Sequence, residues 1–368
     1  MNSRQSSPND LLGGERDPLD DRRFMLCSSH SEEQLMKAIV TTQYGPPEVL
    51  QLREITTPAP AVGQVLIKLY ASSVNPLDSF MMRGPLFFLP TVSKLLKPKH
   101  KVIGADIAGR VESVGRDVKQ FHPGDEVFGA SFGEEGLGGF AEYVCAMEDR
   151  LALKPANMSF EQAAAVPVAA ITALQGLRDQ GQIEQGQKVL IDGASGGVGT
   201  FAIQIAKSFG AEVTAVCSPG NVDTARSIGA DHVIDYTRED FTQSDLLYDL
   251  ILGANAHHSI FDYRRALRPN GIFVMVGGGL ARILQTASLG PLLSRLGSKK
   301  IRFFIAKINS KDLVLLKDLL EAGKIAPVID RCYPLSEAAE ALRYREAGHA
   351  KGKVIISIEH TRHLQGRL

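Results

Sequence analysis

VLIDGASGGVGTFAIQIAKSFGAEVTAVCS, residues 189–218, joins a short apolar run to a glycine-rich turn, an amphipathic helix and a second apolar run. Glycines in such a turn allow a tight bend, close approach of the backbone to a pyrophosphate and close packing of helix on strand. The helix N-terminus attracts phosphates through its N–H groups and its dipole. Ala194 stands where the first glycine of G-x-G-x-x-G would be. The full context still favours a dinucleotide-binding site over a ligand-free glycine turn.

The segments around this stretch repeat the same alternation of apolar runs and amphipathic helices. Continuous apolar runs that alternate with helices are typical of a parallel sheet covered on both faces. We therefore predict an α/β fold with a Rossmann-type, doubly wound parallel sheet over residues 156–324. The expected strands are KVLID, EVTAVC, HVID, YDLILGA and GIFVMVG, with IRFFIA as a sixth, and the expected helices cover 198–209, 222–228 and 260–267.

The remaining segments predict a second domain and a tail. Residues 36–155 contain short β-branched runs separated by glycine and proline, which is typical of a mostly-β domain. Residues 325–360 predict a strand, a helix and a final strand that return to this domain. Residues 1–35 are polar and charged, and we expect them to be disordered. A leucine-rich segment, 278–297, looks broken at Gly290-Pro291.

Composition excludes several classes of protein. The chain has 368 residues, which suggests two domains, and its 41 basic and 41 acidic residues give a formal charge of 0. A chain without net charge has no overall attraction for nucleic acids or anionic membranes, so neither is expected as a partner. The four cysteines lie far apart, which argues against a disulfide framework and a thiolate zinc site. Without a secretory, transit or membrane-spanning pattern, the expected location is the cytoplasm.

The end of the second apolar run bears on the choice of dinucleotide. An NAD site usually has an acidic residue about 20 residues after the glycines, where it binds the ribose 2′-hydroxyl. Here the run ends at Ser218-Pro219, and no acid precedes Asp223. This absence leaves room for a 2′-phosphate, to which Ser218 could donate a hydrogen bond. The sequence thus favours NADPH, with NADH as the alternative.

Several motifs, taken in order and spacing, resemble one family. They are SSVNPLD (72–78), GADIAGRVESVG (104–115), GDEVFG (124–129), AAAVPVAAITALQGL (163–177), GASGGVG (193–199), GADHVIDY (229–236) and GHAKGKVII (348–356). Together they resemble the zinc-free quinone-oxidoreductase branch of the medium-chain dehydrogenase/reductase superfamily, which includes relatives of ζ-crystallin and of the reticulon-interacting oxidoreductase. The resemblance extends from Met36 to about His360. It implies a GroES-like catalytic domain beside a Rossmann domain, with the active site between them, and a homodimer.

The resemblance also implies site residues by position. Asn75 and Thr172 match positions near the nicotinamide ring, where they would be the catalytic pair. The residues that match cofactor-binding positions are Ser195, Gly196, Gly197 and Val198 at the pyrophosphate, Ser218 and Tyr236 at the 2′-phosphate, and His349, Ala350 and Lys351 in a return loop. Zinc dehydrogenases of the superfamily hold their metal with Cys and with His in G-H-E. This chain has Asn75 and Ala105 there, so no metal is expected.

The resulting hypothesis is a zinc-independent, NADPH-dependent oxidoreductase that transfers hydride to quinones or to α,β-unsaturated carbonyl compounds. One alternative is an enoyl-thioester reductase, for which Lys94, Lys97, Lys99 and Lys101 could attract the phosphates of a carrier. Another is a non-catalytic NADPH-binding protein with a structural or RNA-binding role. In each case the expected ligand is a small molecule.

Overall fold

The computed structural model describes residues 34–84, 96–98, 101–132, 137–348 and 350–360. Most of the predicted tail, together with His349, Lys94 and Lys99, lies outside these ranges. The described chain begins as a hairpin of β1 (Leu35–Thr41) and β2 (Leu50–Thr56), so Leu35, which we assigned to the tail, already belongs to a strand. None of the described helices combines the length and apolar character that crossing a membrane requires.

The expected parallel sheet is present and has six strands in the order β10-β9-β8-β11-β12-β13. Every neighbouring pair in it is parallel. Because the order reverses beside β8, the chain crosses from one half of the sheet to the other there, which is where doubly wound folds bind ligands. The strands are β8 (Lys188–Asp192), β9 (Glu212–Cys217), β10 (His232–Asp235), β11 (Tyr248–Gly253), β12 (Leu267–Met275) and β13 (Lys300–Phe303).

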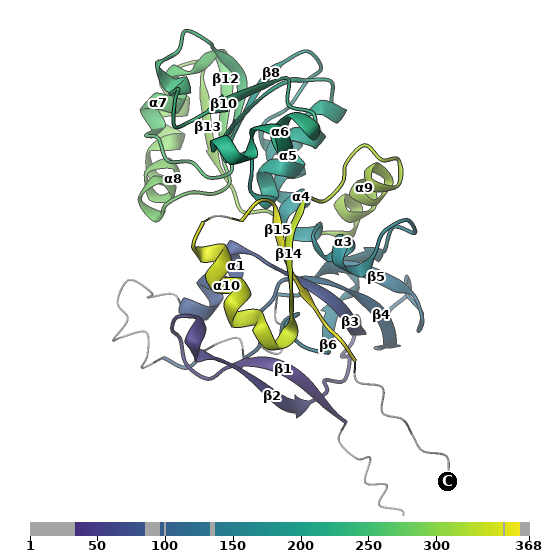
Figure 1. Cartoon of the computed structure of the whole chain (residues 1–368). Coiled ribbons are helices and arrows are strands. Elements are labelled where there is room, and N and C mark those ends of the chain that lie inside the picture. The colour runs from purple at the N-terminus through teal and green to yellow at the C-terminus, as the bar shows by residue number, and fades with distance from the viewer. Residues whose placement is uncertain (1–33, 85–95, 99–100, 133–136, 349, 361–368) are drawn as a thin grey trace, which may run out of the picture. The chain divides into compact units, whose positions relative to one another are not determined.

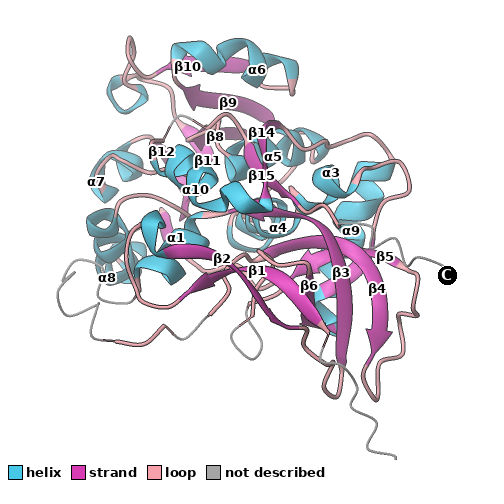
Figure 2. Ribbon diagram, turned by 60° about the horizontal axis from the view of Figure 1, so that its bottom comes forward, coloured by secondary structure: helices cyan, strands magenta, loops and turns pink. Residues whose placement is uncertain are grey.

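Alternate residues of the buried strands pack into two different hydrophobic clusters. Helices lie on both sides of this sheet (Figure 2). Leu190 packs in the cluster with Tyr263, whereas Val189 and Ile191 pack in the other cluster with Phe201. Both faces of the sheet are therefore apolar, which explains the continuous apolar runs. The helices of this part of the chain are α4 (Pro167–Gln175), extended by a π-turn at Gly176–Gln180, α5 (Gly197–Ser208), α6 (Val222–Ser227), α7 (Ile260–Arg265) and α8 (Leu280–Arg295). Two more, α3 (Phe160–Ala164) and α9 (Ser310–Glu321), contact strands of the other sheet.

The glycine turn between β8 and α5 explains why Ala194 is tolerated. The left-handed backbone conformation falls on Gly193, at φ +82°, and Ala194 is buried. Gly199 instead meets a packing limit, because a Cβ there would lie 2.2 Å from the carbonyl oxygen of Gly193. A Cβ on Gly196 would have no neighbour nearer than 3.8 Å. The turn thus needs Gly199 for its own fold and leaves open space at Gly196.

The second sheet has seven strands, all antiparallel except for β14 and β15. Its path is β14-β15-β3-β4-β5-β7, and β6 pairs with β3. Figure 1 shows the C-terminal elements in yellow beside the N-terminal elements in purple and blue. These elements are β3 (Gln64–Val74), α1 (Pro76–Arg83), β4 (Asp106–Val114), β5 (Glu126–Ala130), β6 (Tyr143–Met147), β7 (Leu151–Leu153), β14 (Ile329–Pro334), α10 (Ala338–Glu346) and β15 (Lys353–Ser357).

The expected break at Gly290-Pro291 is wrong, because α8 runs through both residues. Proline lacks the N–H that an interior helical position donates, and it normally ends or kinks a helix. Here Gly290 is buried against β13, where a Cβ would come within 3.2 Å of Ile301 Cγ2. This tertiary contact holds the helix on the sheet and overrides the local preference of the sequence.

We expect Gly199→Ala to destabilise the fold by about 1–3 kcal/mol, because overpacking against backbone forces α5 away from β8. Chemical denaturation measures the change. Gly196→Ala is the matched control and should shift the free energy of unfolding by less than about 1 kcal/mol. Equal losses in the two variants would contradict the packing role assigned to Gly199.

Candidate functional site

The glycine turn lies directly against the strand that returns from the end of the chain. Gly352 N donates to the carbonyl oxygen of Ser195 at 2.8 Å, and Gly196 forms an isolated parallel bridge with Gly352. Gly196 is also the N-cap residue of α5, and no side chain caps that helix. Open space at Gly196, an uncapped helix of twelve residues and its positive dipole together fit a pyrophosphate. Ser195, Gly196, Gly197 and Val198 would hold it.

Near the end of β9 lie Ser218 and Tyr236, the two residues predicted for the 2′-phosphate, and Lys351 of the predicted return loop. Lys351 Nζ donates to the carbonyl oxygen of Gly220 at 3.4 Å, so it lies against the loop that begins with Ser218. Tyr236 N donates to the carbonyl oxygen of Cys217 at 3.2 Å, and the Tyr236 side chain is 61% exposed. The backbone of Tyr236 and the ammonium of Lys351 thus both contact the segment 217–220 that includes Ser218, where the adenosine end of a dinucleotide would lie.

Asn221 also belongs to this end of the site. Its Nδ2 donates to Ser218 Oγ at 2.7 Å, which holds the hydroxyl in place. Its Oδ1 is buried without a hydrogen-bond partner, so the loop contains a polar atom that a bound molecule or water could satisfy. Ala350 is half-buried and packs on the core of the second sheet, while His349 lies outside the described residues.

A buried polar cluster lies where β3, β4 and β15 meet. Asp106 is fully buried, and Asn75 and Lys353 are each 3% exposed. Lys353 Nζ donates to Asp106 Oδ2 at 3.0 Å and to Asn75 Oδ1 at 2.7 Å. Asp106 also accepts from Asn75 Nδ2 at 2.9 Å, from Ser73 Oγ at 2.5 Å and from Val168 N at 2.8 Å. The carboxylate is thus neutralised by one ammonium and fully hydrogen-bonded, as a buried charge requires.

Thr172 and Asp78 are joined to this cluster through the backbone. Thr172 Oγ1 donates to the carbonyl oxygen of Val168 at 2.6 Å, one turn back along α4, and the backbone N–H of Val168 donates to Asp106. Asp78 accepts from the backbone N–H of Asn75 at 2.6 Å and of Ala105 at 3.1 Å. Burial, and secondarily the charge of Asp106, raises the pKa of Asp78 to about 7. Asp78 therefore fixes the two segments that carry the cluster.

The donor set of this cluster does not fit a metal ion. The two oxygens that could act as ligands, on Asn75 and Asp106, both accept from the ammonium of Lys353, whose charge would repel a cation. Within the described ranges, no three His, Cys, Asp or Glu side chains gather into a set that could hold a metal. We therefore derive no chemistry from a metal at this position.

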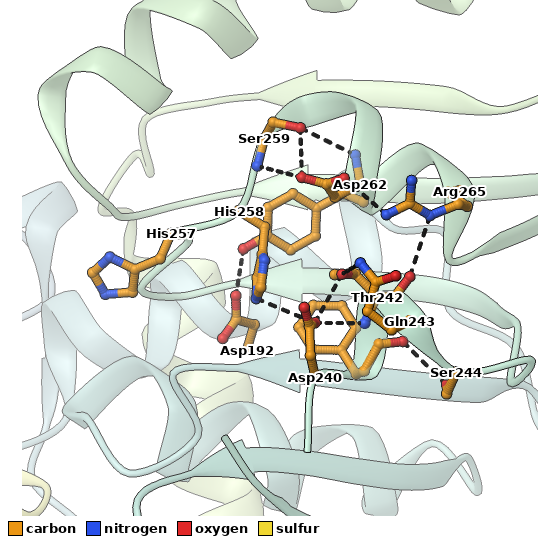
Figure 3. Close-up of polar contacts among 12 residues, drawn as sticks. Asp192, Asp240, Thr242, Gln243, Ser244, His257, His258, Ser259, Asp262 and Arg265 are labelled. Carbon is orange, nitrogen blue, oxygen red and sulfur yellow. Dashed lines mark hydrogen bonds and ion pairs between the residues drawn. The ribbon is translucent and has the colours of Figure 1, made fainter. Parts of the chain in front are cut away.

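A second buried acid stands at the end of β8 (Figure 3). Asp192 accepts a short hydrogen bond from the hydroxyl of Tyr263, and burial raises the pKa of both groups. The backbone carbonyl of Asp192 accepts from Ala254 N at 2.8 Å, so this residue holds the loop after β11 beside the glycine turn. In that loop, His258 Nε2 lies 3.8 Å from Asp240 Oδ1. The His257 side chain points away from Asp192 and Asp240 (Figure 3).

The sequence analysis missed Asp106, Lys353 and Asp192 as members of the site. Each is a charged residue at the first or last position of a strand, next to buried apolar residues. A charge in such a place is rarely buried without a partner. That signal was present, but only the fold shows which partners the three residues have.

Comparison with known proteins identifies both halves of the fold. A family model described as "Alcohol dehydrogenase GroES-like domain" matches residues 61–156, and one described as "Zinc-binding dehydrogenase" matches residues 228–356. A 2-methylene-furan-3-one reductase of Solanum lycopersicum is 38% identical over 331 residues, which cover 87% of this chain and 79% of that protein. A chloroplastic NADPH-dependent alkenal/one oxidoreductase of Arabidopsis thaliana is 36% identical, with 87% and 79% covered.

A solved structure gives the same result. The quinone oxidoreductase from Coxiella burnetii superposes with a TM-score of 0.78 at 32% identity, covering 89% of this chain and 100% of that chain. The similarity includes both the mostly-β part and the parallel sheet, so it extends to the whole described fold rather than to a dinucleotide-binding unit alone.

We expect the stability difference between wild type and Asp78→Asn to depend on pH. Because the folded-state pKa of Asp78 is raised to about 7, the folded protein binds a proton that the unfolded chain releases above about pH 4. The wild type therefore loses stability as the pH rises from about 4 to about 7, relative to a variant that cannot ionise. The difference should move by about 1 to 4 kcal/mol in favour of Asp78→Asn.

Parallel denaturation of both proteins at pH 5 and pH 8 measures this shift, and all other titrations cancel in the difference. A constant difference, or one that favours the wild type at pH 8, would contradict the raised pKa.

Proposed function

The chain belongs to the quinone-oxidoreductase branch of the medium-chain dehydrogenase/reductase superfamily, and on this basis we propose that it reduces quinones or α,β-unsaturated carbonyl compounds with NADPH. The observation that carries the proposal is the contact between a pyrophosphate-type glycine turn and a buried Asn75–Asp106–Lys353 cluster. NADPH, when bound, supplies one hydride. One proton, from solvent or a donor group, completes the two-electron reduction of the acceptor.

The chemistry of the cluster favours conjugated acceptors over simple alcohols. Alcohol oxidation by zinc enzymes uses the metal to stabilise an alkoxide. The cluster has no Lewis acid to offer, because an ammonium takes the place that a metal would need. Conjugated acceptors spread the incoming charge over several atoms and depend more on positioning. Asn75 and Thr172, in this proposal, lie at the nicotinamide end of the cofactor.

We expect NADPH-dependent reduction of a quinone or an enone to exceed the oxidation of ethanol or benzyl alcohol by at least about a hundredfold in kcat/KM, roughly the contribution of one oriented electrostatic group. The absorbance of the reduced nicotinamide follows both reactions, acceptor reduction with NADPH and alcohol oxidation with NADP⁺, each with and without EDTA. Faster alcohol oxidation, or activity lost to the chelator, would overturn the proposal. Tight NADPH binding without turnover would support the non-catalytic alternative instead.

The preference for NADPH rests on the adenosine end of the site. Ser218 offers a hydroxyl held by Asn221, Lys351 adds a charge beside the same loop, and Tyr236 exposes its phenol nearby. Charge-assisted hydrogen bonds to a phosphate contribute about 1.5–3 kcal/mol each. One relative is named for its dependence on NADPH. These observations support a 2′-phosphate at this position.

Ser218→Asp should reverse the preference. We expect the wild type to bind NADPH roughly ten- to a hundredfold more tightly than NADH. In the variant, the new carboxylate repels the 2′-phosphate and accepts a hydrogen bond from the 2′-hydroxyl of NADH. Because the chain has 8 tyrosines and no tryptophan, quenching of tyrosine emission can follow the titration.

Ser227→Asp, at an exposed position at the end of α6, adds the same charge and is the control. It should leave the ratio unchanged. The preference for NADPH would be contradicted if the ratio of the two cofactor affinities were unaltered in Ser218→Asp. Equal affinities of the wild type for NADPH and NADH would contradict it as well, and NADH would then be the expected hydride donor.

We also propose that the protein forms a homodimer through β13. This strand pairs with β12 along one edge, and in the described part of the chain no strand covers its other edge. Beyond it Ile305 is 79% exposed, and the adjoining helix α8 exposes four leucines. They are Leu280, Leu284, Leu289 and Leu292, and Leu296 is exposed at the C-cap of the helix. A second copy would cover an open strand edge and these apolar side chains, both of which isolated proteins tend to protect.

A further inference from the structure

Lys353 connects two parts of the molecule that the chain keeps far apart. Its backbone follows Gly352, which is hydrogen-bonded to the glycine turn at Ser195. Its side chain then passes Gly197, where a Cβ would lie only 2.6 Å from Lys353 Cδ. The ammonium ends between Asn75 and Asp106. One side chain thus extends from the pyrophosphate turn to the buried cluster.

The ammonium also determines the orientation of the Asn75 amide. In the observed orientation, Oδ1 accepts from Lys353 and Nδ2 donates to Asp106. The flipped amide would place its NH₂ group against the ammonium and its oxygen against the carboxylate, so both contacts would become repulsive. Only one orientation satisfies the two charges. Without Lys353, the Oδ1 side of the Asn75 amide would lose the contact that fixes its orientation.

Lys353 also controls the charge near the cofactor. A pyrophosphate is anionic, and a buried carboxylate close to its turn would oppose its binding. Asp106 is that carboxylate, and Lys353 is the cation that contacts it, with 3% of its side chain exposed. Burying such a pair contributes little net stability, since the desolvation of both charges offsets their attraction. Stability alone is therefore a weak reason for the pair to be present.

We propose that Lys353 is a positioning residue, which holds the Asn75 amide in its working orientation and supports the pyrophosphate turn at Gly197, so that cofactor binding and the geometry of hydride transfer depend on one side chain. This inference rests on the proposed function for its kinetic consequence, but not for its effect on cofactor binding. Lys353 acts through Asn75 and the turn.

The test compares Lys353→Met and Lys353→Arg with the double variant Asp106→Asn/Lys353→Met. The double variant removes both charges together and should fold even where the single Met variant, with an uncompensated carboxylate, does not. Lys154→Met is the matched control. The Lys154 side chain is also largely buried, with 6% of it exposed, and its ammonium pairs with Glu126 at 3.2 Å. Its hydrogen bonds go to the carbonyl oxygens of Pro155 and Met158, away from the cluster and the turn.

In the Met-containing variants, we expect kcat for the best acceptor to fall about a hundredfold or more while KM for the acceptor changes less than about threefold, the pattern of lost transition-state positioning. The deuterium isotope effect on kcat, from NADPH labelled at C4, should rise as hydride transfer becomes slower. Lys353→Arg keeps the charge and should recover kcat to within about tenfold of wild type. Lys154→Met should lower stability only.

Binding of NADPH provides the readout that does not depend on turnover. The Met-containing variants should bind NADPH about tenfold more weakly and change the emission of the bound nicotinamide. If the wild type reduces no acceptor, the proposed function fails, and this binding result alone decides on Lys353. A kcat and an NADPH affinity within about threefold of wild type in both Met-containing variants, as in Lys154→Met, would overturn the inference.

Discussion

The buried ion pair between Asp106 and Lys353 is the contact on which the arrangement of the site depends. A carboxylate with no exposed surface needs hydrogen-bond donors and a compensating charge. Here a hydroxyl, an amide and an ammonium donate to Oδ2 of Asp106, and a backbone N–H donates to Oδ1. These donors come from β3, from Asn75 directly after it, from α4 and from β15. Since the strands β3 and β15 and the helix α4 all meet at one carboxylate, this contact ties α4 to the seven-stranded sheet.

The same contact gives a role to the return of the chain to the seven-stranded sheet after the parallel sheet is complete. β15 begins beside the glycine turn, continues into the antiparallel sheet next to β3 and so carries Lys353 across the junction. A separate dinucleotide-binding unit would need only the turn and α5. Gly352 and Lys353 contact the glycine turn, and the ammonium of Lys353 contacts the buried cluster. A change in the turn therefore affects the cluster, and a change in the cluster affects the turn.

The local parts of this site could be predicted from the sequence, and the long-range parts could not. The turn at 193–199 has its strand and helix on either side, and short-range spacing is enough to identify it. Neither Asp106 nor Lys353 belongs to a pattern of this kind. They are separated by 247 residues, and only the pairing of β15 with β3 and of β3 with β4 brings them together. Likewise, α8 follows its packing on β13 rather than the preference of Pro291.

The cluster also limits how the chain can assist a reaction. Its positive charge is already engaged by Asp106 and Asn75, so the ammonium offers little direct stabilisation to a developing negative charge on an acceptor. The polar groups of Asn75 and Thr172 are engaged with protein atoms as well. What this arrangement supplies is a hydrogen-bonded amide, a supported turn and a buried ion pair beside the proposed cofactor site. Such a site accelerates a reaction mainly by holding its partners in place, which suits acceptors that delocalise charge themselves.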